Sequence, residues 1–427
     1  MIPPPPRVDI AVVGSGAAGL MAAIQAGRAS NGALSIVALD GATKLGAKIL
    51  IAGGGRCNVT HHAVDASDFA GSTRPAIHKV LARFDVQETT RFFQELGVTL
   101  KREETGKLFP VTDRAQTVLD ALLSAAESAG VRLVYPWRVT RIEPAPDGFV
   151  LFRDEADASG IHARRVVLAT GGKSVPKTGS DGQGYALAQS LGHSVTPHLV
   201  PGLVPLLLPQ GHWLRSLSGV SFTGRVELRN ETGRVLISFT GPMLCAHFGL
   251  TGPAIMDMSR YYLLARQEGA RVQLQVSLLP ERTVTDLDVA LQRLGGETPL
   301  AFMRKRLPER LVRALGDSVH VAVGDSGAQF TRESRTKLVR SLLEMPLPIA
   351  GDRGFKVAEV TAGGVPLSEL HLGTLESRRT PGLHICGEIC DVDGRIGGFN
   401  FQWAWASGKV AGVSAAQALT SRLPHDQ

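Results

Sequence analysis

The sequence is poor in cysteine and in aromatic residues. Four cysteines among 427 residues, Cys57, Cys245, Cys386 and Cys390, are too few and too scattered for a disulfide framework. Cys386 and Cys390 are spaced C-x3-C, but no histidine and cysteine cluster completes a zinc site, so we expect reduced, partly buried thiols and no metal. Aromatic residues make up 5% of the chain, which disfavours an RNA-binding module with interleaved aromatic side chains.

The sequence also lacks long hydrophobic runs. The most apolar stretch, residues 199–209, is short and broken by prolines, far below the ~20 residues needed to cross a bilayer. The opening residues MIPPPPRVDIAVV lack a charged region followed by an apolar one, so no signal peptide is expected. We therefore expect a cytoplasmic protein with no membrane partner, and the sequence carries no signal for an oligomeric state.

Glycine, by contrast, is abundant, with 48 residues. The glycines cluster at residues 14–19, 53–55, 171–184 and 394–398, where a backbone can approach a ligand closely. A hydrophobic content of 44% with 20% charged residues excludes intrinsic disorder, and the length suggests two to three domains. The net charge of +7 suits an anionic cofactor or nucleic acid but discriminates weakly over a surface this large.

The first glycine cluster has the order of a dinucleotide-binding motif. Residues 9–13, DIAVV, predict a parallel strand buried on both faces, followed by Gly14-Ser15-Gly16-Ala17-Ala18-Gly19 and the helix-forming segment LMAAIQAGR. Gly14 permits the tight turn, Gly16 lets the backbone approach a pyrophosphate, and Gly19 lets the helix pack on the strand. A second strand ends at Asp40, where a ribose-binding acid belongs. This order favours dinucleotide binding over an incidental glycine-rich turn.

The segment after Asp40 favours FAD over NAD. Residues 44–58, KLGAKILIAGGGRCN, do not form a second βαβ crossover; they carry two lysines, an arginine and three consecutive glycines. Such a segment can bring backbone N–H groups and positive charge against a large anionic cofactor. The alternative is a surface loop. Ordering three consecutive glycines on folding costs much conformational entropy, however, which argues against a segment that has only a packing role.

Further along, the stretches RVTRIEP, FVLFRDE and IHARRVVLATGG predict a three-stranded meander with turn residues between its strands. The last strand runs into Ala169-Thr170-Gly171-Gly172, another close-approach loop. Gly172-Lys173-Ser174 matches the tail of an ATP-binding P-loop, but Val167 occupies the leading glycine position, so that interpretation fails.

These segments together resemble the family of two-dinucleotide-fold FAD-dependent oxidoreductases that includes the BaiN and YhiN proteins and aminoacetone oxidase. The resemblance rests on AVVGSGAAGLMAA, KLGAKILIAGGGRCNVT, LFPVTDRAQTVLDALL, ATGGKSVPKTGSDGQGYALAQSLGH, LCAHFGLTGPAI, VTAGGV and GEICDVDGRIGGFNFQWAWASGKVAG, which span nearly the whole chain in order. Two positions depart from the family pattern: Arg395-Ile396 stands where Tyr-Thr is usual, and Phe399 replaces Tyr. Because both lie close to the expected flavin, no relative's substrate is carried over.

The resemblance implies a second half-site near the C-terminus. Glu388 follows a strand end, where it can hydrogen-bond a polyol such as a ribityl chain. Gly397-Gly398-Phe399-Asn400 opens the last helix, whose N–H groups can face the flavin pyrimidine oxygen. We interpret Trp403 and Trp405 as ordinary packing residues. The full set of expected cofactor contacts is Gly14, Gly16, Ala17, Ala18, Gly19, Asp40, Lys48, Gly54, Gly55, Arg56, Cys57, Asn58, Val139, Ala169, Thr170, Gly171, Gly172, Glu388, Gly397, Gly398, Asn400 and Phe401.

The expected fold class is α/β, with a Rossmann-like FAD-binding domain of the glutathione-reductase type interrupted by an insert. Residues 1–193 and 347–427 form the two parts of the FAD-binding domain, and residues 194–346 form the insert. Alternating apolar and polar residues predict a β-barrel-like part over 194–280. Helical periodicity predicts a helical part over 281–346, in which residues 304–313 are rich in cations that are more typical of a solvated helix face than of a nucleic-acid patch.

FAD itself carries the redox step, so the protein orients it and shapes the substrate pocket. His247, in a turn-rich segment of the insert, is the candidate general acid or base, with a structural histidine as the alternative. No partner cysteine near Cys57 supports a redox disulfide. No second G-x-G-x-x-G follows a strand, so NAD(P)H, if used, binds transiently over the flavin. We expect a small-molecule oxidoreductase of the C=C-reducing or amine-oxidising class; the alternative is an FAD-containing RNA-binding or RNA-modifying protein that uses the basic insert.

Overall fold

The computed structural model describes residues 5–153 and 160–421, which form two compact units. The first unit comprises residues 1–199 and 360–427, and the second comprises residues 200–359. The second unit therefore begins and ends later in the chain than residues 194 and 346, the insert boundaries expected from the sequence. The later end is explained by two short strands, at residues 345–347 and 351–352, which pair with strands of the second unit.

A mixed sheet with a parallel centre organises the first unit. The parallel strands are β22 (Leu383–Ile385), β10 (Ile161–Leu168), β1 (Arg7–Val13), β2 (Ile36–Leu39) and β7 (Val131–Val134), in that order. All four residues of β2 and most of β1 are buried, as continuous apolar runs in a sheet covered on both faces require. The Rossmann-like α/β architecture predicted from the sequence is thus confirmed.

The predicted meander is also present. Strands β8 (Arg141–Ala145), β9 (Gly148–Phe152) and β10 pair successively in antiparallel fashion, and β10 also joins the parallel sheet through β1. Residues 154 and 155 of the predicted middle strand lie outside the described residues. Beyond β22, the sheet continues with β21 (Glu376–Ser377) and ends with β20 (Leu370–His371).

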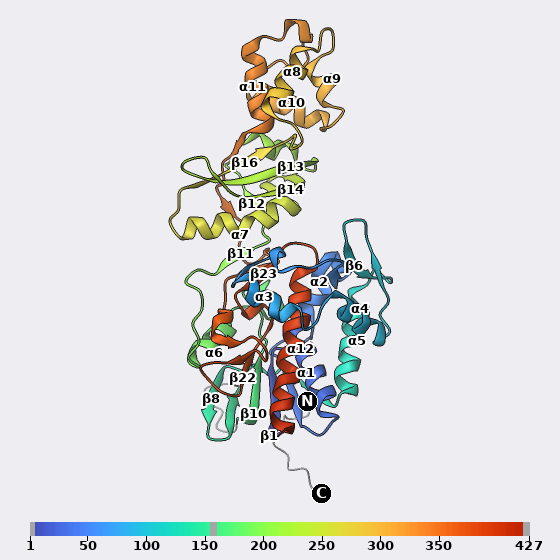
Figure 1. Ribbon diagram of the computed structural model, residues 1–427, viewed down its shortest axis with the longest axis vertical. Helices are drawn as coiled ribbons and strands as arrows, with labels where there is room; N and C mark the ends of the chain where they lie inside the picture. The colour runs from blue at the N-terminus through green and yellow to red at the C-terminus, as the bar shows by residue number, and fades with distance from the viewer. Residues whose placement is uncertain (1–4, 154–159, 422–427) are drawn as a thin grey trace. The chain divides into compact units, whose positions relative to one another are not determined.

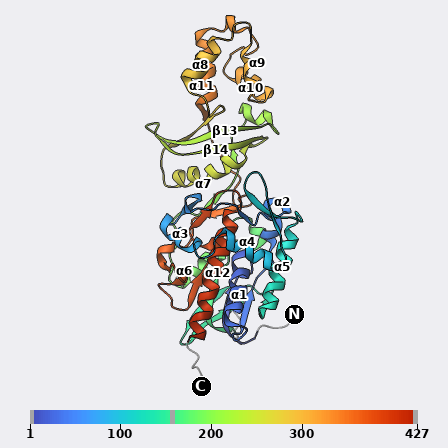
Figure 2. The same cartoon turned by 45° about the vertical axis from the view of Figure 1, so that its right-hand side comes forward.

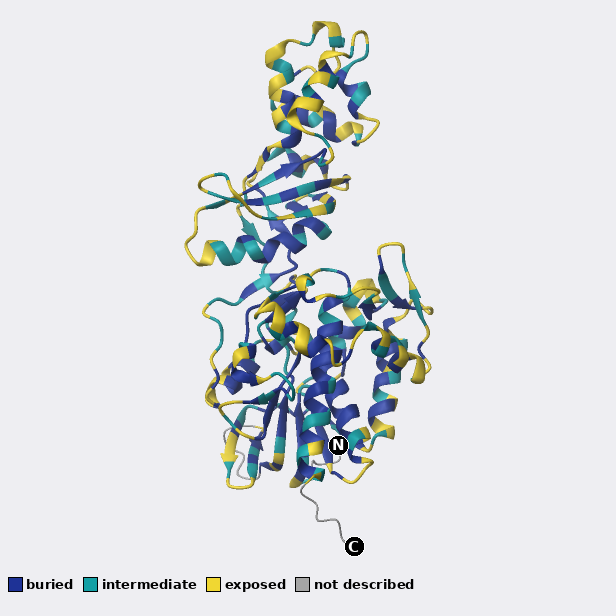
Figure 3. Cartoon of the chain, in the orientation of Figure 1, coloured by how far each residue is buried: buried dark blue, intermediate teal, exposed yellow. Residues whose placement is uncertain are grey.

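Two helices, α1 (Ala17–Ser30) and α12 (Phe399–Thr420), run side by side through the core of the first unit (Figures 1 and 2). Glycine makes the close approach possible, because a Cβ at Gly408 would lie 2.5 Å from the carbonyl oxygen of Ala18, and one at Gly412 would lie 2.0 Å from that of Ala22. Figure 3 shows most of both helices as buried.

The predicted packing role of the two tryptophans of α12 is confirmed. Trp403 and Trp405 are buried, and their indole N–H groups donate to the carbonyl oxygens of Gly387 (3.0 Å) and Val59 (2.9 Å). The remaining elements of the unit are α2 (Ala47–Gly55), α3 (Arg74–Leu81), α4 (Val86–Glu95), α5 (Ala115–Ser128), α6 (Gln183–Ser190), β3 (Thr60–His61), β4 (Phe69–Gly71), β5 (Leu100–Arg102), β6 (Lys107–Pro110), β19 (Val360–Ala362) and β23 (Val392–Gly394).

The second unit combines a seven-stranded sheet with helices. The long antiparallel strands β13 (Ser221–Asn230), β14 (Val235–Ala246) and β16 (Val272–Ser277) coincide with the alternating segments of the sequence. The predicted barrel is not confirmed, because within residues 200–359 the strand path runs openly from β17 to β18. The shorter strands are β11 (Val200–Gly202), β12 (Leu206–Leu207), β15 (Gly249–Thr251), β17 (Met345–Leu347) and β18 (Gly351–Asp352).

Helix α7 (Pro253–Gln267) contacts the sheet of the second unit. The helical periodicity of residues 281–346 is realised in α8 (Val284–Gln292), α9 (Pro299–Met303), α10 (Glu309–Ser318) and α11 (Arg332–Leu343), whose apolar sides belong to the same core cluster as the sheet.

Candidate functional site

Four loops of the first unit meet at one edge of its parallel sheet. Val13 is in register with Leu39 and Leu168, and Leu168 is in register with Ile385, so the four strands end together. The loops that follow them start at residues 14, 40, 169 and 386, and each contains residues assigned to cofactor binding from the sequence. The carboxyl edge of a parallel sheet is the usual location of a ligand site in this architecture.

The three glycines of the first loop have different surroundings. Gly14 has φ +97°, and a Cβ there would lie 2.5 Å from the carbonyl oxygen of Ala169. A Cβ at Gly19 would lie 1.7 Å from the carbonyl oxygen of Gly14. At Gly16, by contrast, an added Cβ meets no described atom within 4 Å. Packing within the protein therefore requires Gly14 and Gly19, whereas the backbone at Gly16 faces open space that a ligand could fill.

The start of α1 can accept an anion. No side chain caps this terminus, where Gly16 is the N-cap residue, and the first turn holds no acidic residue. The N–H groups of Ala17 and Ala18 lie at this positive end of the helix dipole. The hydroxyl of Ser15 is buried and finds no hydrogen-bond partner among the described residues. These features suit a pyrophosphate.

Asp40 lies at the end of β2 and braces the same loop. Its Oδ2 accepts the N–H of Ser15 (2.7 Å), and its Oδ1 accepts the N–H of Ala42 (2.8 Å). The contact with Ser15 has no signal in the sequence. It fixes the carboxylate beside the loop, where the ribose role predicted for Asp40 would place it.

The glycine-rich end of α2 and the residues that follow it adopt a rare backbone conformation. Gly53, Gly54 and Gly55 all have positive φ, and the non-glycine Cys57 has φ +60°. Burial raises the pKa of the Cys57 thiol to about 12, so the sulfur is a neutral thiol and a poor nucleophile. Asn58 Oδ1 is buried with no partner in the described part of the chain.

Arg56, in contrast, is committed to other groups. Its guanidinium lies 2.6 Å from Glu103 Oε1 and 4.0 Å from the centre of the Phe109 ring. The guanidinium thus interacts with an acid and an aromatic ring of the protein, and the cofactor contact predicted for Arg56 stays a prediction.

Lys48 and Glu388, 340 residues apart in sequence, form the polar centre of the site. Lys48 Nζ lies 2.5 Å from Glu388 Oε2 and 2.6 Å from Ser174 Oγ. Glu388 Oε1 accepts from Ser174 Oγ (2.7 Å) and from the N–H of Thr361 (2.9 Å). The sequence predicted Lys48 and Glu388 but missed Ser174 and Thr361. In the sequence, Ser174 is only the last residue of a rejected P-loop match, and Thr361 is only one residue of the VTAGGV segment; neither was assigned a role.

The loop after β10 and helix α6 each add a buried hydroxyl, Thr170 Oγ1 and the Tyr185 phenol. Neither Thr170 Oγ1 nor the Tyr185 hydroxyl has a hydrogen-bond partner among the residues described. Burial, followed by the nearby charge of Glu388, raises the pKa of Tyr185 above its usual value, so the phenol stays protonated. Tyr185 was not predicted from the sequence, because its role depends on burial.

The last glycine turn leads into α12. A Cβ at Gly398 would lie 2.6 Å from the backbone of Thr60, and no side chain caps the helix. The side chain of Asn400 is engaged, since Oδ1 accepts the N–H of Gly394 (2.8 Å) and Nδ2 donates to its carbonyl oxygen (2.9 Å). The Phe401 ring stacks on Trp405 at 5.5 Å. The cofactor contacts predicted for Asn400 and Phe401 stay predictions.

Two further predicted residues lie outside the four loops. Val139 is buried in the stretch between β7 and β8. His247 is exposed in the turn between β14 and β15 of the second unit, where its carbonyl oxygen accepts from Arg215 Nε (2.8 Å). The catalytic role of His247 stays a prediction.

These residues fit an FAD molecule. The uncapped N-termini of α1 and α12 can face its phosphates and its flavin ring. The open space at Gly16 can hold a pyrophosphate. Four buried polar atoms have no hydrogen-bond partner among the described residues and could bond to the cofactor. Those atoms are Ser15 Oγ, Asn58 Oδ1, Thr170 Oγ1 and the Tyr185 hydroxyl.

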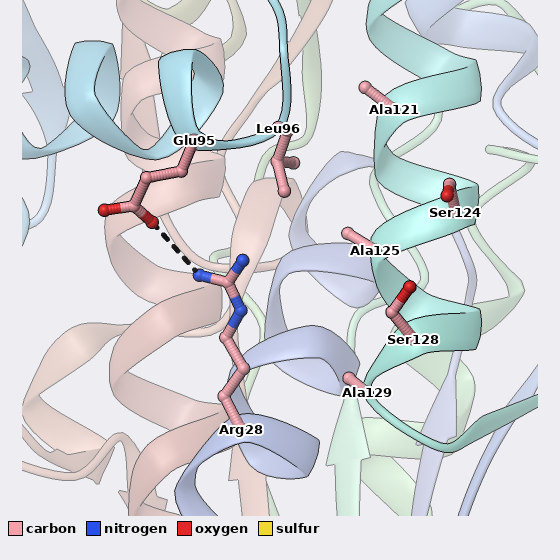
Figure 4. Close-up of a pocket in the computed structure, with 8 residues that line it drawn as sticks. All are labelled: Arg28, Glu95, Leu96, Ala121, Ser124, Ala125, Ser128 and Ala129. Carbon is pink, nitrogen blue, oxygen red and sulfur yellow. Dashed lines mark ion pairs between the residues drawn. The ribbon is translucent and has the colours of Figure 1, made fainter.

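A separate hollow of about 320 Å³ lies among α1, α4 and α5 (Figure 4). Its lining is formed by Arg28, Glu95, Leu96, Ala121, Ser124, Ala125, Ser128 and Ala129. Arg28 and Glu95 form an ion pair of 3.5 Å across it. None of the predicted site residues lines this hollow, so it is not the candidate site.

The four cysteines are free thiols and all are buried. Within residues 5–153 and 160–421, no three histidine, cysteine or acidic side chains converge as metal ligands would. In the same residues, no helix combines the length and apolarity needed to span a bilayer.

Comparison with known proteins defines the class. Residues 8–414 match the HI0933-like protein Rossmann domain family, and the chain belongs to this family. It is therefore a FAD-dependent oxidoreductase, as the sequence resemblance implied.

Individual relatives are similar over almost their entire lengths. The chain is 35% identical over 413 residues to a 3-dehydro-bile acid delta(4,6)-reductase of Clostridium scindens, covering 96% of this chain and 99% of the relative. It is 32% identical over 410 residues to a ribosomal RNA dihydrouridine synthase of Escherichia coli, covering 94% and 96%. A 3-ketosteroid delta1-dehydrogenase of Sterolibacterium denitrificans shares the fold, with a TM-score of 0.52, 13% identity, and coverage of 97% and 100%.

Proposed function

We propose that this protein uses FAD to reduce a carbon–carbon double bond conjugated to a carbonyl group in a small molecule. The observation that carries the proposal is the bond type common to two relatives with different substrates. A 3-dehydro-bile acid delta(4,6)-reductase acts on double bonds in conjugation with a 3-oxo group, by its name. Dihydrouridine differs from uridine by one saturated C–C bond next to a carbonyl group, so its synthesis reduces the same kind of bond.

The residues of the first unit would hold the cofactor in the following way. The start of α1 binds the pyrophosphate and Asp40 binds a ribose hydroxyl, while Glu388, oriented by Lys48 and Ser174, binds the ribityl chain. The bound cofactor, once it has been reduced by two electrons, would supply the hydride. The N–H groups at the start of α12 stabilise negative charge on the pyrimidine side.

Reduction of a conjugated double bond also requires a proton at the carbon next to the carbonyl. His247 is our proposed donor, because a histidine side chain is the commonest general acid in enzymes. Cys57 is a weaker candidate, since its thiol is fully buried and its pKa is raised to about 12.

NAD(P)H is the proposed electron donor and binds transiently over the flavin. Anaerobic stopped-flow mixing with NADH, NADPH and a panel of primary amines tests this step. We expect bleaching of the flavin band by one of the nicotinamides and none by the amines. Bleaching by an amine with neither nicotinamide active would instead assign the chain to the amine-oxidising class and refute the proposal.

A uridine in RNA is the second candidate substrate. It is favoured by the Escherichia coli relative and by the charge of residues 200–359, which hold 20 lysines and arginines against 15 acidic residues, or +5 of the net +7. Tight binding of a ribosomal RNA transcript that weakens steeply with salt, together with a 2 Da mass gain in a uridine, would establish this substrate. Binding without the mass gain would leave the small-molecule proposal in place.

A further inference from the structure

His61, the last residue of β3, lies against the glycine turn that leads into α12. A Cβ added at Gly397 would lie 3.8 Å from His61 Cδ2, and one at Gly398 would lie 2.6 Å from the backbone of Thr60, the other residue of β3. The His61 ring stacks on the ring of Phe399, with centroids 4.9 Å apart and planes inclined by 22°. Strand β3 therefore supports the turn and the first residue of the helix.

Both nitrogens of the His61 ring are engaged by backbone groups. Nδ1 lies 2.7 Å from the carbonyl oxygen of Ala63, and Nε2 lies 3.1 Å from the carbonyl oxygen of Thr105. Thr105 belongs to the turn between β5 and β6, 44 residues further along the chain. Because it is bonded to two separate segments, the ring is held in one orientation. With both nitrogens engaged in this way, His61 is poorly placed to donate a proton to a substrate.

Phe399 is the first residue of α12, so its position sets the direction of the N–H groups at the helix start. The first helical bond runs from the N–H of Gln402 to the carbonyl oxygen of Gly398 (3.0 Å), and the three N–H groups before it have no acceptor within the helix. The ring of Phe399 is buried, and it meets the rings of His61 and Phe69 at centroid distances of 4.9 and 6.1 Å. These ring contacts hold the helix start in place.

We propose that His61 is a positioning residue that keeps the N–H groups at the start of α12 aligned with the pyrimidine side of the flavin. The inference rests on the proposed function, in which this helix start stabilises negative charge on the flavin. Such N–H groups are effective only when they are held in advance at the right distance and angle. A ring that is bonded at both nitrogens and stacked on Phe399 supplies that rigidity. His61 thereby makes the reduction potential of bound FAD less negative.

Sulfite addition to the oxidised flavin tests this assignment in the holoprotein. The adduct places negative charge on the pyrimidine side, and its dissociation constant is read from the loss of the flavin absorbance band. We expect His61→Ala to raise this constant about tenfold and to shift the midpoint potential of FAD, measured against a reference dye, to a more negative value. His61→Phe retains an aromatic ring against Phe399 but loses both hydrogen bonds, so it should change both quantities less.

His62→Ala is the matched control. His62 is the adjacent histidine, is exposed, and has its ring centroid 4.6 Å from that of His61. We expect this variant to leave the sulfite constant and the midpoint potential unchanged. Wild-type values in both His61 variants, or an equal change in His62→Ala, would overturn the assignment. A lower melting temperature in His61→Ala, with the wild-type potential in the FAD that stays bound, would also overturn it, because His61 would then be a structural residue only.

A double-mutant cycle tests whether His61 acts through Phe399. If it does, His61→Ala should change the sulfite constant much less in the Phe399→Leu protein than in the wild type; equal changes in the two backgrounds would contradict this route. The measurements need neither substrate nor nicotinamide, so they stay separate from the proposed reaction. If no conjugated enone is reduced but His61→Ala still weakens sulfite binding, the reaction proposal fails alone. If enones are reduced and both His61 variants bind sulfite as the wild type does, the positioning proposal fails alone.

Discussion

Two glutamates of the first unit, Glu388 and Glu369, have similar hydrogen-bond partners, but Glu388 belongs to the candidate site and Glu369 to a structural network. Glu369 accepts from Ser194 Oγ and from Arg379 Nη2, both at 2.7 Å, and lies 2.8 Å from His193 Nδ1. Glu388 has a serine, a backbone N–H and a cation as its partners. In chemical type the two sets of partners are nearly equivalent.

The surroundings of the two networks differ. Beside Glu388 lie Gly172, where a Cβ would come within 2.9 Å of its carboxylate, and the Tyr185 hydroxyl without a described partner. Around Glu369 the hydrogen-bonding groups are satisfied: His193 Nε2 lies 2.7 Å from Ser377 Oγ, which also accepts the N–H of Arg379 at 3.0 Å. The Glu388 network therefore has groups that can still bind a ligand. The Glu369 network, formed with His193, Ser194, Ser377 and Arg379, has its hydrogen bonds satisfied within the protein, and we call it the Glu369 clamp.

This comparison also removes a tempting interpretation. Glu369, His193 and Ser377 follow one another as in a hydrolytic triad, but Ser377 is buried and its oxygen accepts two backbone N–H groups. Substrate cannot reach that hydroxyl. A polar network therefore indicates a functional site only when unsatisfied groups and glycine turns accompany it.

The largest expected effect comes from filling the ligand opening. Gly16→Val should abolish FAD binding, because a branched side chain would occupy the space where backbone meets pyrophosphate. The fold should survive, since that space holds no described protein atom within 4 Å of an added Cβ. The FAD released on denaturation and the melting temperature of the apoprotein measure the two effects. Gly296→Val, at another open glycine, is the control. Full flavin occupancy in Gly16→Val would show that the loop is misassigned.

The next largest effect is on the rate of turnover, with FAD binding unchanged. His247→Gln should leave the FAD content unchanged and slow the half-reaction that moves a substrate proton by ~10²–10⁴-fold, the usual range for loss of a general acid. Reduction by the nicotinamide should be less affected. The matched control is His320→Gln, an exposed histidine of the same unit. Equal rates for wild type and His247→Gln in both half-reactions would make His247 a structural residue.

Asp40→Ala should weaken FAD binding by about 1.5–3 kcal/mol, the range for hydrogen bonds to a charged group. Part of the loss will come from the loop itself, since Asp40 also holds the N–H of Ser15. Titration of the apoprotein with FAD by fluorescence quenching gives the dissociation constant. Asp9→Ala, which removes an acid bonded to Ser35, should not change it; an equal loss in both variants would argue against a ribose contact.

The smallest effect tests the clamp. Burial alone would raise the pKa of Glu369, but hydrogen bonds from Arg379, Ser194 and His193 outweigh it and lower the pKa to about 2. A carboxyl with a depressed folded-state pKa stabilises the fold above pH 4.5, and this contribution is lost as the pH falls toward 2. Glu369→Gln should lower the free energy of unfolding by about 1–3 kcal/mol at neutral pH and flatten that acid dependence. Urea unfolding of the apoprotein at several pH values measures both, and a change in FAD affinity without a stability loss would contradict the clamp.

The sequence predicted the parts of the site that depend on local pattern. Gly14, Gly16 and Asp40 follow from strand, loop and helix order, and the meander follows from alternating residues and turns. Ser174, Thr361 and Tyr185 escaped prediction because their significance comes from burial and from contacts across more than 100 residues of sequence. The barrel expected in the insert is not confirmed, for a related reason, since alternation identifies strands but does not determine whether a sheet closes.

One measurement tests the central claim most directly. Protein reduced photochemically under anaerobic conditions is mixed with methyl 4-oxopent-2-enoate, while the flavin absorbance and the products are followed. The account predicts reoxidation of the flavin with formation of one saturated ester per FAD. A flavin that stays reduced in the presence of this enone, of its acid and of a uridine-containing RNA, yet is reoxidised by oxygen, would contradict reduction of a conjugated double bond as the function.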